Sequence, residues 1–456
     1  MRPVKLYAAL FAIGLAIYAL FAWSRSGAQS AAPQFVYQAD AWLHGHSAIQ
    51  PPLVDNDWAR VETVALADGR ELAGRRLQTR SVFHALSGEE VPLAQVVASR
   101  GVTWYMSFPP LPTLLMLPSA AISGRAGNDV IPTLLVAALI PPLALLVLRR
   151  LAAAGLSKRT RGEDLWLVAA LAIGSVLLFS AVQGKVWYTA HVVGVALALV
   201  YAWASIEARR PLVAGLALGA AALARTPMAF MLPLFVLEAW RVSGGLATWR
   251  ADRATMRKQL WPLLARFIAP IAAFAIAGMI YNAVRFGSPT EFGHTYLDVR
   301  QQGQIEQYGL ASFHYLSRNL AVAFALLPEV SLRSPYVQIG GHGLAMWFTT
   351  PIILFALWPR EKPAIHRALW LTIACVAIPS LLYQNSGWVQ FGYRFSLDYL
   401  VFVVMLLAIG GRPLGAVAKT LIVLGIAINV FGAITFDRFW QYYRVGGNAY
   451  DVVVAN

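Results

Sequence analysis

The sequence predicts an all-α polytopic membrane protein of about eleven transmembrane helices, with a long first external loop carrying surface-lying helices and a small β-rich insert. Of its 456 residues, 58% are hydrophobic and only 13% are charged, and the mean hydropathy is +0.58. This composition is typical of polytopic membrane proteins and excludes an ordinary soluble domain. The net charge of +15 comes from Lys and Arg in short loops between apolar runs. The charge therefore indicates membrane topology and not nucleic-acid binding.

The first apolar run, "MRPVKLYAALFAIGLAIYALFAW", has a charged start, about 20 apolar residues and no A-x-A cleavage pattern. We interpret it as a retained signal-anchor helix. The further expected spans are 128–148, 165–183, 189–206, 211–225, 227–240, 261–284, 343–358, 368–384, 399–411 and 417–435. Two of these runs are short and are joined by "ARTPM", which predicts a shallow helical hairpin.

The stretch "WYMSFPPLPTLLMLPSAAISG" (104–124) is apolar but is interrupted by prolines. The loop that follows residue 148 is basic, so the positive-inside rule places it in the cytoplasm together with the N-terminus. If 104–124 crossed the membrane as well as the first span and 128–148, the chain would cross three times between the N-terminus and this loop. The two could then not both be cytoplasmic. We therefore expect 104–124 not to cross, and to contain a helix that lies on the outer membrane surface.

These boundaries divide the chain into six parts. They are a first transmembrane helix (1–23), a first external loop with juxtamembrane helices and the insert (24–127), a transmembrane core (128–284), an external loop (285–342), C-terminal transmembrane helices (343–435) and an external tail (436–456). Within the insert, "VETVALADGRELAGRRL" alternates on either side of Asp68-Gly69. This pattern predicts a hairpin in a β-rich subdomain of about 40 residues.

The first candidate cluster follows the first span and contains Asp40, His44, His46, Asp55 and Asp57. A carboxylate beside the bilayer can act as a general base or a metal ligand toward a lipid-bound substrate. The structural alternative is a solvated loop in which these carboxylates lie on a helix or cap a turn. A metal site at the two histidines has less support, because no third ligand has suitable spacing.

A second cluster, "GKVWYTAHVVG", contains Lys185, Trp187, Tyr188 and His191. The lysine and the two aromatic residues also suit interfacial anchors of a membrane helix. His191 falls inside the start of a span, where an ionisable side chain usually faces the bundle interior or a cavity.

A third cluster is divided between "YNAVRFGSPTEFGHTY" and "NSGWVQFGYRFSLDYL". Each segment places an arginine near a carboxylate at an external helix end: Arg285 with Glu291, and Arg394 with Asp398. The planar guanidinium suits phosphate recognition, because it donates two parallel hydrogen bonds. The alternative is that each arginine pairs with its carboxylate and joins loops together.

The order of several motifs resembles a known family. The motifs are "FVYQADAWLHG", "NDWA", "YMSFPPLPTLLMLP", "VWYTAHVVGVALAL", "AGLALGAAALARTPMAFMLPLF", "YNAVRFGSPTEFG" and "QFGYRFSLDYL". They resemble bacterial integral-membrane glycosyltransferases of the GT-C superfamily, more specifically relatives of protein O-mannosyltransferases and aminoarabinose transferases. The resemblance covers nearly the whole chain except the insert at 59–100 and the C-terminal tail.

This resemblance implies a GT-C type bundle whose first external loop carries surface-lying helices and a catalytic acid. It also implies a polyprenyl-phosphate sugar donor that is attacked at the outer membrane face. The Asp-Glu pair of the mannosyltransferases would fall near Ala31 and Ala32. The base is therefore carried over to Asp57, as first choice, or to Asp40, and the choice between them stays open.

The implied reaction is an inverting transfer, in which a carboxylate deprotonates the acceptor while cations stabilise the phosphate leaving group. The acceptor is a lipid, a glycan or a protein. The expected substrate-binding residues are Lys185, His191, Arg285, Tyr393, Arg394 and Asp398. No cofactor is demanded by the sequence, although a divalent metal could share the stabilisation of the phosphate.

The expected partners are a polyprenyl-phosphate-linked sugar donor and the lipid bilayer, and no nucleic acid. The expected location is the bacterial inner (cytoplasmic) membrane, with the active site on the periplasmic side. One alternative is a secondary transporter or flippase of a lipid-linked or small-molecule substrate, which should place ionisable residues or broken helices near the membrane midplane. Another is a structural scaffold for envelope assembly, which would not need the acid-rich first loop.

Overall fold

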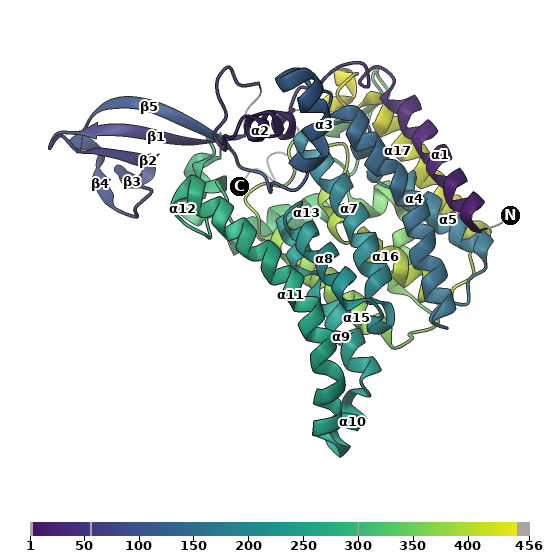
Figure 1. Ribbon diagram of the computed structural model, residues 1–456. Coiled ribbons are helices and arrows are strands. Elements are labelled where there is room, and N and C mark those ends of the chain that lie inside the picture. The colour runs from purple at the N-terminus through teal and green to yellow at the C-terminus, as the bar shows by residue number, and fades with distance from the viewer. Residues whose placement is uncertain (1–2, 55–56, 300, 445–456) are drawn as a thin grey trace.

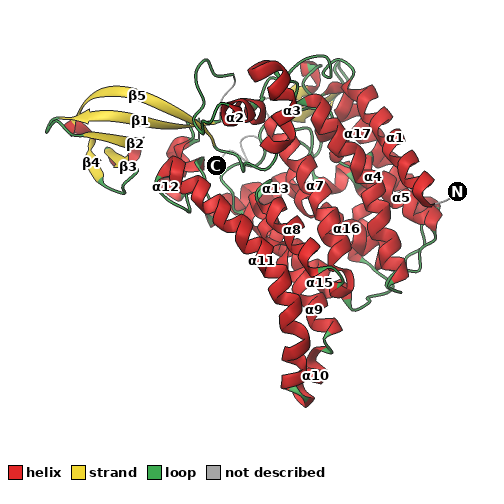
Figure 2. Ribbon diagram, viewed as in Figure 1, coloured by secondary structure: helices red, strands yellow, loops and turns green. Residues whose placement is uncertain are grey.

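The computed structural model describes residues 3–54, 57–299 and 301–444. It consists of a helical bundle with an antiparallel sheet projecting from one end (Figures 1 and 2). Within the described residues, five helices are long and apolar enough to cross a membrane. They are α1 (Pro3–Ala22), α4 (Val130–Ala153), α7 (Val186–Ser205), α11 (Arg253–Phe286) and α17 (Ala416–Thr435). A bent pair, Thr226–Val242 with Gly245–Ala251, would make a sixth. The expected count of about eleven spans is therefore not confirmed.

The other expected spans form short or broken helices. They are α5 (Arg161–Ala172), α6 (Leu177–Ala181), α8 (Pro211–Ala222), α9 (Leu232–Val242), α14 (Met346–Thr349), α15 (Ile365–Leu381) and α16 (Leu397–Ile409). Helix α16 is instructive because all 13 of its residues are buried. A helix of that length is about 20 Å long, and a helix that is apolar on all sides belongs to a protein interior. It is therefore enclosed by its neighbours.

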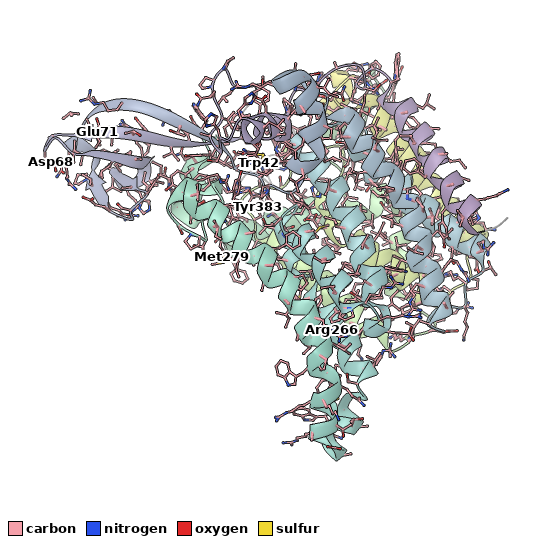
Figure 3. All side chains as sticks on the ribbon, viewed as in Figure 1. Trp42, Asp68, Glu71, Arg266, Met279 and Tyr383 are labelled. Carbon is pink, nitrogen blue, oxygen red and sulfur yellow. The ribbon has the colours of Figure 1, made fainter. Side chains whose placement is uncertain are left out.

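The projecting sheet is the expected β-rich insert. Its strands are β1 (Trp58–Leu66), β2 (Glu71–Leu77), β3 (Val82–Ala85), β4 (Glu90–Pro92) and β5 (Val96–Met106), in the order β4-β3-β2-β1-β5. The predicted turn joins β1 to β2, with Gly69 at φ +86° and the Arg70 amide donating to Asp68 Oδ1 at 3.0 Å. The sheet extends further than predicted, because β5 takes in the start of the 104–124 stretch. Figure 3 shows Asp68 and Glu71 at the tip of the sheet.

The base of the sheet is fixed to the end of α11. The ring of Phe286 stacks on Tyr296 at 5.3 Å between centroids and meets Tyr105 of β5 edge-on at 5.4 Å. Ala59 and Val61 of β1 complete this apolar cluster. This cluster holds Asp57, the residue before β1, at the end of the bundle.

The first external loop also contains two helices that pack together, α2 (Gln34–Leu43) and α3 (Thr113–Ser123). Helix α3 has 11 residues and is about 16 Å long, whereas a hydrocarbon core is about 30 Å thick. It is therefore too short to cross. Its Leu114 and Ile122 are 53% and 85% exposed, which leaves an apolar face uncovered for lipid.

The basic loops meet at the opposite end of the bundle. Lys158, after α4, pairs with Glu361, before α15, at 2.9 Å. Arg159 donates to the Leu407 carbonyl at the end of α16 at 2.7 Å, and Ser157 donates to the adjacent carbonyl, that of Ala408. Helix α10 (Gly245–Ala251) protrudes beyond this end (Figure 1). The loops that the sequence predicts to be cytoplasmic therefore gather at one end of the bundle.

The remaining elements lie between α11 and α15 and after α17. They are α12 (Gln302–Tyr308), α13 (Leu316–Phe324), β6 (Glu329–Val330), β7 (Val337–Gly340) and β8 (Tyr443–Arg444), the strands pairing in the order β6-β7-β8. The expected external tail is described up to residue 444. Residues 445–456, and Asp55 of the first acidic cluster, lie outside the described residues.

Candidate active site

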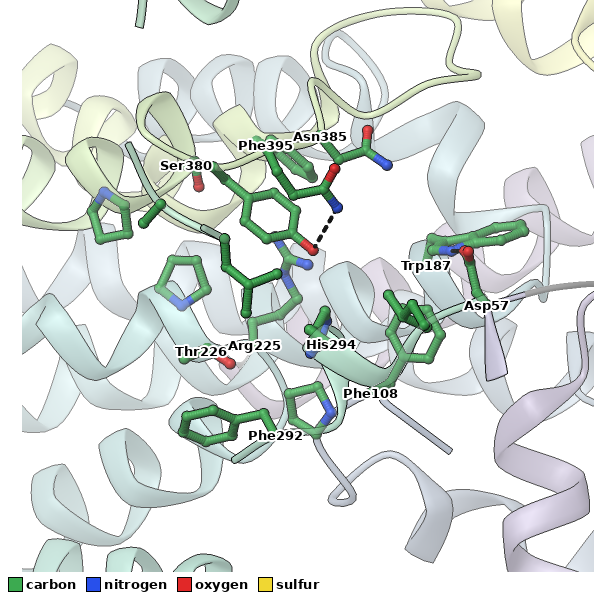
Figure 4. Close-up of a pocket in the computed structure, with 18 of the residues that line it drawn as sticks. Asp57, Phe108, Trp187, Arg225, Thr226, Phe292, His294, Ser380, Asn385 and Phe395 are labelled. Atoms are coloured by element: carbon green, nitrogen blue, oxygen red, sulfur yellow. Dashed lines mark hydrogen bonds between the residues drawn. The ribbon is translucent and has the colours of Figure 1, made fainter. Parts of the chain in front are cut away.

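A cavity of about 260 Å³ lies between the base of the sheet and the bundle (Figure 4). Its walls come from distant parts of the chain: the loops that flank the sheet, the start of α7, the α8–α9 turn, the loop after α11 and the α15–α16 connection. Its polar lining includes Asp57, Trp187, Arg225, His294, Tyr383 and Arg394. Apolar pockets with a few convergent polar groups are the usual form of a ligand site.

Asp57 presents its carboxylate at this cavity. It has a left-handed backbone, with φ +65°, which aspartate tolerates better than most residues. The indole Nε1 of Trp187 donates to its Oδ2 at 2.9 Å, and Ser107 Oγ donates to its backbone carbonyl at 3.2 Å. In Figure 4, Asp57 and Trp187 lie together at one side of the cavity and Arg225 lies at the other. Trp187 therefore orients the carboxylate, and Ser107 holds the backbone of the same residue.

Arg225, in the turn between α8 and α9, is held by a buried carboxylate. Its Nε and Nη2 donate to the two oxygens of Asp398 at 3.1 and 2.8 Å. Asp398 is fully buried, and its Oδ1 also lies 3.1 Å from Nδ1 of the equally buried His191. This bidentate pairing leaves the Nη1 group of Arg225 outside both hydrogen bonds. The arginine is thus fixed in orientation while it lines the cavity.

Arg394 is a second cation in the cavity wall, and it is 4% exposed. Its guanidinium donates to the carbonyls of Gly387 and Val389 and lies over the Tyr188 ring at 5.3 Å. Among the described residues it forms no salt bridge, and its buried Nε has no hydrogen-bond partner. Burial lowers the pKa of Arg394, while Asp57 favours its charged form and Arg225 opposes it. A buried cation without a carboxylate partner is costly unless an anion joins it.

His294 and Tyr383 lie next to each other in the cavity wall. Their ring centroids are 6.3 Å apart, and Phe108 packs on the other side of His294 at 6.2 Å. Burial, with some effect of the Arg225 charge, lowers the pKa of His294 to about 4. Burial raises the pKa of Tyr383 to about 12. At neutral pH the cavity therefore contains a neutral imidazole and a protonated phenol.

The mouth of the cavity is apolar. Phe230 and Phe292 line it and remain 48% and 44% exposed. Across the described ranges, no group of three or more His, Cys, Asp or Glu side chains is placed to hold a metal ion. Two positively charged side chains, Arg225 and Arg394, are among the described residues that line the cavity.

The predicted site residues divide between this cavity and other places. Asp57 and Arg394 line it, and His191 and Asp398 lie behind Arg225. Tyr393 does not line it: it is 1% exposed and donates its amide to the Leu344 carbonyl.

Asp40, Lys185 and Arg285 lie away from the main cavity. Asp40 contacts Arg125 at 3.5 Å and His44 at 3.6 Å. Lys185 pairs with Asp437 at 2.8 Å and lines a different cavity. Arg285 lines a small adjoining cavity of about 20 Å³.

Two expected pairings are not formed as predicted. Asp398 binds Arg225 and not Arg394, because it faces the interior toward α7 whereas Arg394 turns toward the carbonyls of the preceding loop. Arg285 donates to the carbonyls of Tyr281 and Met106 and to Asn282 Oδ1. Glu291 accepts from its own loop, at the Gly293 amide and the Thr295 hydroxyl.

The sequence did not predict four of the residues that line the cavity, namely Arg225, Trp187, His294 and Tyr383. One signal was present for Arg225. It is an ionisable residue between two short apolar helices followed by a proline, which is a recurring setting for binding sites in membrane proteins. The indole of Trp187 appeared only as a membrane anchor, since nothing in the sequence links it to Asp57.

No family model matches the sequence, and no curated protein matches it. Solved structures that resemble the fold include the apo form of the Archaeoglobus fulgidus oligosaccharyltransferase, with a TM-score of 0.42 and 13% identity, covering 97% of this chain and 57% of that chain. They also include archaeal oligosaccharyltransferase AglB from Archaeoglobus fulgidus in complex with an inhibitory peptide and a dolichol-phosphate, with a TM-score of 0.43 and 13% identity, covering 97% of this chain and 56% of that chain. This chain thus spans little more than half the length of these neighbours.

Proposed function

We propose that this protein is an inverting membrane glycosyltransferase that uses a polyprenyl-phosphate-linked sugar as donor. The observation that carries the proposal is one cavity that contains an oriented carboxylate, Asp57, and two arginines, Arg225 and Arg394. Such a set provides a base for an acceptor and cations for a phosphate leaving group. The motif order in the sequence supports the same class of reaction.

The two arginines would bind the donor phosphate. Arg225 is oriented by Asp398 before any ligand arrives, so little conformational freedom is lost on binding. Arg394 is a buried cation without a carboxylate partner among the described side chains, and a phosphate would supply the missing counter-charge. Both side chains remain charged as the bond to the sugar breaks, so they stabilise the leaving phosphate.

Asp57 would act as the general base. The acceptor hydroxyl or amine attacks the anomeric carbon of the sugar, and the bond from that carbon to the phosphate oxygen breaks. Asp57 takes the acceptor proton, and the polyprenyl phosphate leaves with the bonding electron pair. One displacement at the anomeric carbon inverts its configuration. Trp187 contributes by holding the carboxylate through its indole N–H.

The surroundings of the cavity suit a lipid donor. Phe230 and Phe292 offer an exposed apolar mouth that can take the first units of a polyprenyl tail. The cavity also lies at the bundle end opposite the basic loops around Lys158 and Glu361. By the positive-inside rule this end is external. We therefore assign the reaction to the outer face of a bacterial inner membrane.

One structural feature bears on the transporter alternative. The cluster of His191, Arg225 and Asp398 is buried and ionisable, as proton relays in transporters are. However, Asp398 is the second residue of α16 and His191 is the sixth of α7. The cluster therefore lies near helix ends and beside the cavity, where it positions Arg225.

The proposal is tested by donor consumption. The purified full chain is reconstituted in liposomes with a panel of polyprenyl-phosphate hexoses and pentoses, and free polyprenyl phosphate is measured by mass spectrometry. We expect at least one donor to release polyprenyl phosphate, slowly with water as acceptor, and Asp57→Asn to abolish this release. If no donor in the panel is consumed, or if Asp57→Asn consumes donor as the unchanged chain does, the proposed reaction is wrong.

A further inference from the structure

A second cavity, also of about 260 Å³, lies apart from the candidate active site. It is formed where three candidate membrane helices meet: just after α1, just before α7 and just after α17. The charged residues that line it are Arg25, Lys185, Asp437 and Arg438. Three cations and one carboxylate give it a net charge of +2. Lys185 lines this cavity and Trp187 lines the first, so the two cavities flank the first turn of α7.

Several buried polar atoms at this second cavity have no hydrogen-bond partner among the described residues. They are Nη1 of Arg25, Nε of Arg438 and Oε1 of Gln183. Gln183 is only 1% exposed, and its amide nitrogen already donates to the Phe179 carbonyl at 3.1 Å. Buried polar groups in native proteins are generally satisfied. Three of the residues that line the cavity therefore carry polar atoms that the described part of the protein leaves unsatisfied.

The electrostatic setting favours an anion. Burial and the neighbouring Arg438 cation lower the pKa of Arg25 to about 10. Asp437 is the carboxylate in the lining, and it is already engaged by Lys185 at 2.8 Å. Asp129, outside the lining, accepts two hydrogen bonds from the lining residue Ser30, at 2.8 and 2.5 Å. An anion in the cavity would relieve the repulsion between the two arginines.

The position of the cavity limits the source of that anion. Helices that cross a membrane end at its headgroup layer, and tryptophan is enriched there. Next to the cavity, Trp23 is 74% exposed and Trp440 is 48% exposed. The lining also includes the hydroxyl of Ser24 and the amide of Gln29. A phosphate-bearing lipid headgroup would find charge and hydrogen-bond partners at this depth.

We propose that the cavity between the ends of α1 and α17 and the start of α7 binds the phosphodiester headgroup of an anionic bilayer lipid, with Arg25, Lys185 and Arg438 as its cationic ligands. This site is separate from the proposed donor site, because Tyr188 stands between them. The Tyr188 ring carries Arg394 on one face at 5.3 Å and meets Phe436 at 6.1 Å. Binding here does not depend on whether the protein transfers sugar.

The test measures lipid binding directly. The full chain in neutral detergent is titrated with short-chain phosphatidylglycerol and, separately, with phosphatidylcholine, and bound lipid is counted by native mass spectrometry. We expect saturable binding of phosphatidylglycerol, with an affinity at least about tenfold higher than that for phosphatidylcholine. Charge-assisted hydrogen bonds to the headgroup would account for such a difference. Inorganic phosphate is added as a competitor. If inorganic phosphate displaces the lipid with equal affinity, the ligand of this cavity is free phosphate and not a lipid headgroup.

Two substitutions that change the net charge of the cavity in opposite directions make the test decisive. Lys185→Gln removes one cation and should weaken phosphatidylglycerol binding about tenfold. Asp437→Asn removes the carboxylate and should tighten phosphatidylglycerol binding. Asparagine tolerates the left-handed backbone at this position, where φ is +63°. Neither change touches Arg25 or Arg438, which donate to helix-end carbonyls. Arg333→Gln, an exposed arginine elsewhere, is the matched control. Equal binding of the two lipids, or shifts of the same sign in both variants, would overturn the proposal.

Discussion

At the scale of single residues, the proposed chemistry depends on how Asp57 and the two arginines are held. Asp57 is fixed by the indole of Trp187, and Arg225 by the buried carboxylate of Asp398. Arg394 is held by the backbone carbonyls of Gly387 and Val389. Each of the three therefore has a different structural support, and each can be removed separately.

The first prediction concerns the base. Asp57→Asn keeps the size and the hydrogen bond from Trp187 but cannot take a proton, so transfer should fall by about 10²–10⁴-fold. Donor binding and the thermal unfolding of the protein should change little. Asp40→Asn is the control, because Asp40 contacts Arg125 and His44 outside the cavity. A larger loss in Asp40→Asn than in Asp57→Asn would reverse the assignment.

The second prediction concerns the phosphate ligands. Arg394→Lys and Arg225→Lys keep the charge but lose the planar fork, so the KM for the donor should rise about tenfold or more in each variant. The double substitution should be less than additive if both side chains bind one phosphate. Arg100→Lys, on an exposed part of β5, serves as the control. Normal donor use by Arg394→Lys and Arg394→Ala together would mean that this arginine only joins loops.

The third prediction concerns pH. Burial lowers the pKa of His294 to about 4 from its ordinary value of 6.5, so between these values the unfolded chain binds a proton there that the folded chain does not. Stability should therefore rise as the pH rises from about 4 to 6.5. His294→Gln should reduce this rise in the unfolding temperature, measured in detergent. An identical pH dependence in His294→Gln would show that the imidazole is not desolvated in this way.

The sequence indicated some of these residues and not others. Asp57 was a candidate because a carboxylate beside the bilayer can act as a base, and Arg394 because a planar guanidinium suits phosphate recognition. Arg225 and Asp398 lie 173 positions apart, so no local pattern in the sequence connects them. The helical spacing instead suggested that Asp398 holds Arg394, since the two lie four positions apart in the chain. In the structure the two side chains turn away from each other: Asp398 pairs with Arg225, and Arg394 donates to the carbonyl of Gly387.

At the scale of elements, most of the expected apolar runs are helical, but their lengths depend on packing. The five long candidate spans are strongly apolar, and the sequence marks them well. Helix α16 has only 13 residues, and its neighbours bury all of them. Periodicity cannot distinguish such an enclosed helix from a lipid-facing one, because both are apolar on every side.

The fourth prediction concerns the orientation of the elements. Cys375 is the single cysteine, so Cys375→Ser gives a background for single-cysteine labelling in intact cells. Lys158→Cys, in the loop after α4, should react only after the membrane is made permeable. Ser87→Cys, an exposed position in the turn between β3 and β4, should react with an impermeant reagent from outside. The reverse pattern would invert the topology and place the cavity in the cytoplasm.

At the scale of the whole molecule, the cavity is a product of chain topology. Its polar groups come from the sheet junction, α7, the α8–α9 turn, the loop after α11 and the α15–α16 connection. The projecting sheet contributes by its base and not by its tip, since the cluster around Phe286 fixes β1 next to the bundle. The sequence predicted the first external loop and the segments around Arg285 and Arg394 at the external end, but not which side chains converge at the cavity.

The most direct measurement is a structure of the full chain in lipid nanodiscs with bound polyprenyl phosphate, determined by electron cryo-microscopy. The proposed function predicts the phosphate within hydrogen-bond distance of Arg225 and Arg394, with Asp57 across the cavity and the tail leaving past Phe230 and Phe292. A lipid headgroup in the second cavity, near Arg25 and Arg438, would be consistent with this result. A polyprenyl phosphate bound away from Arg225 and Arg394, with their cavity empty, would contradict it.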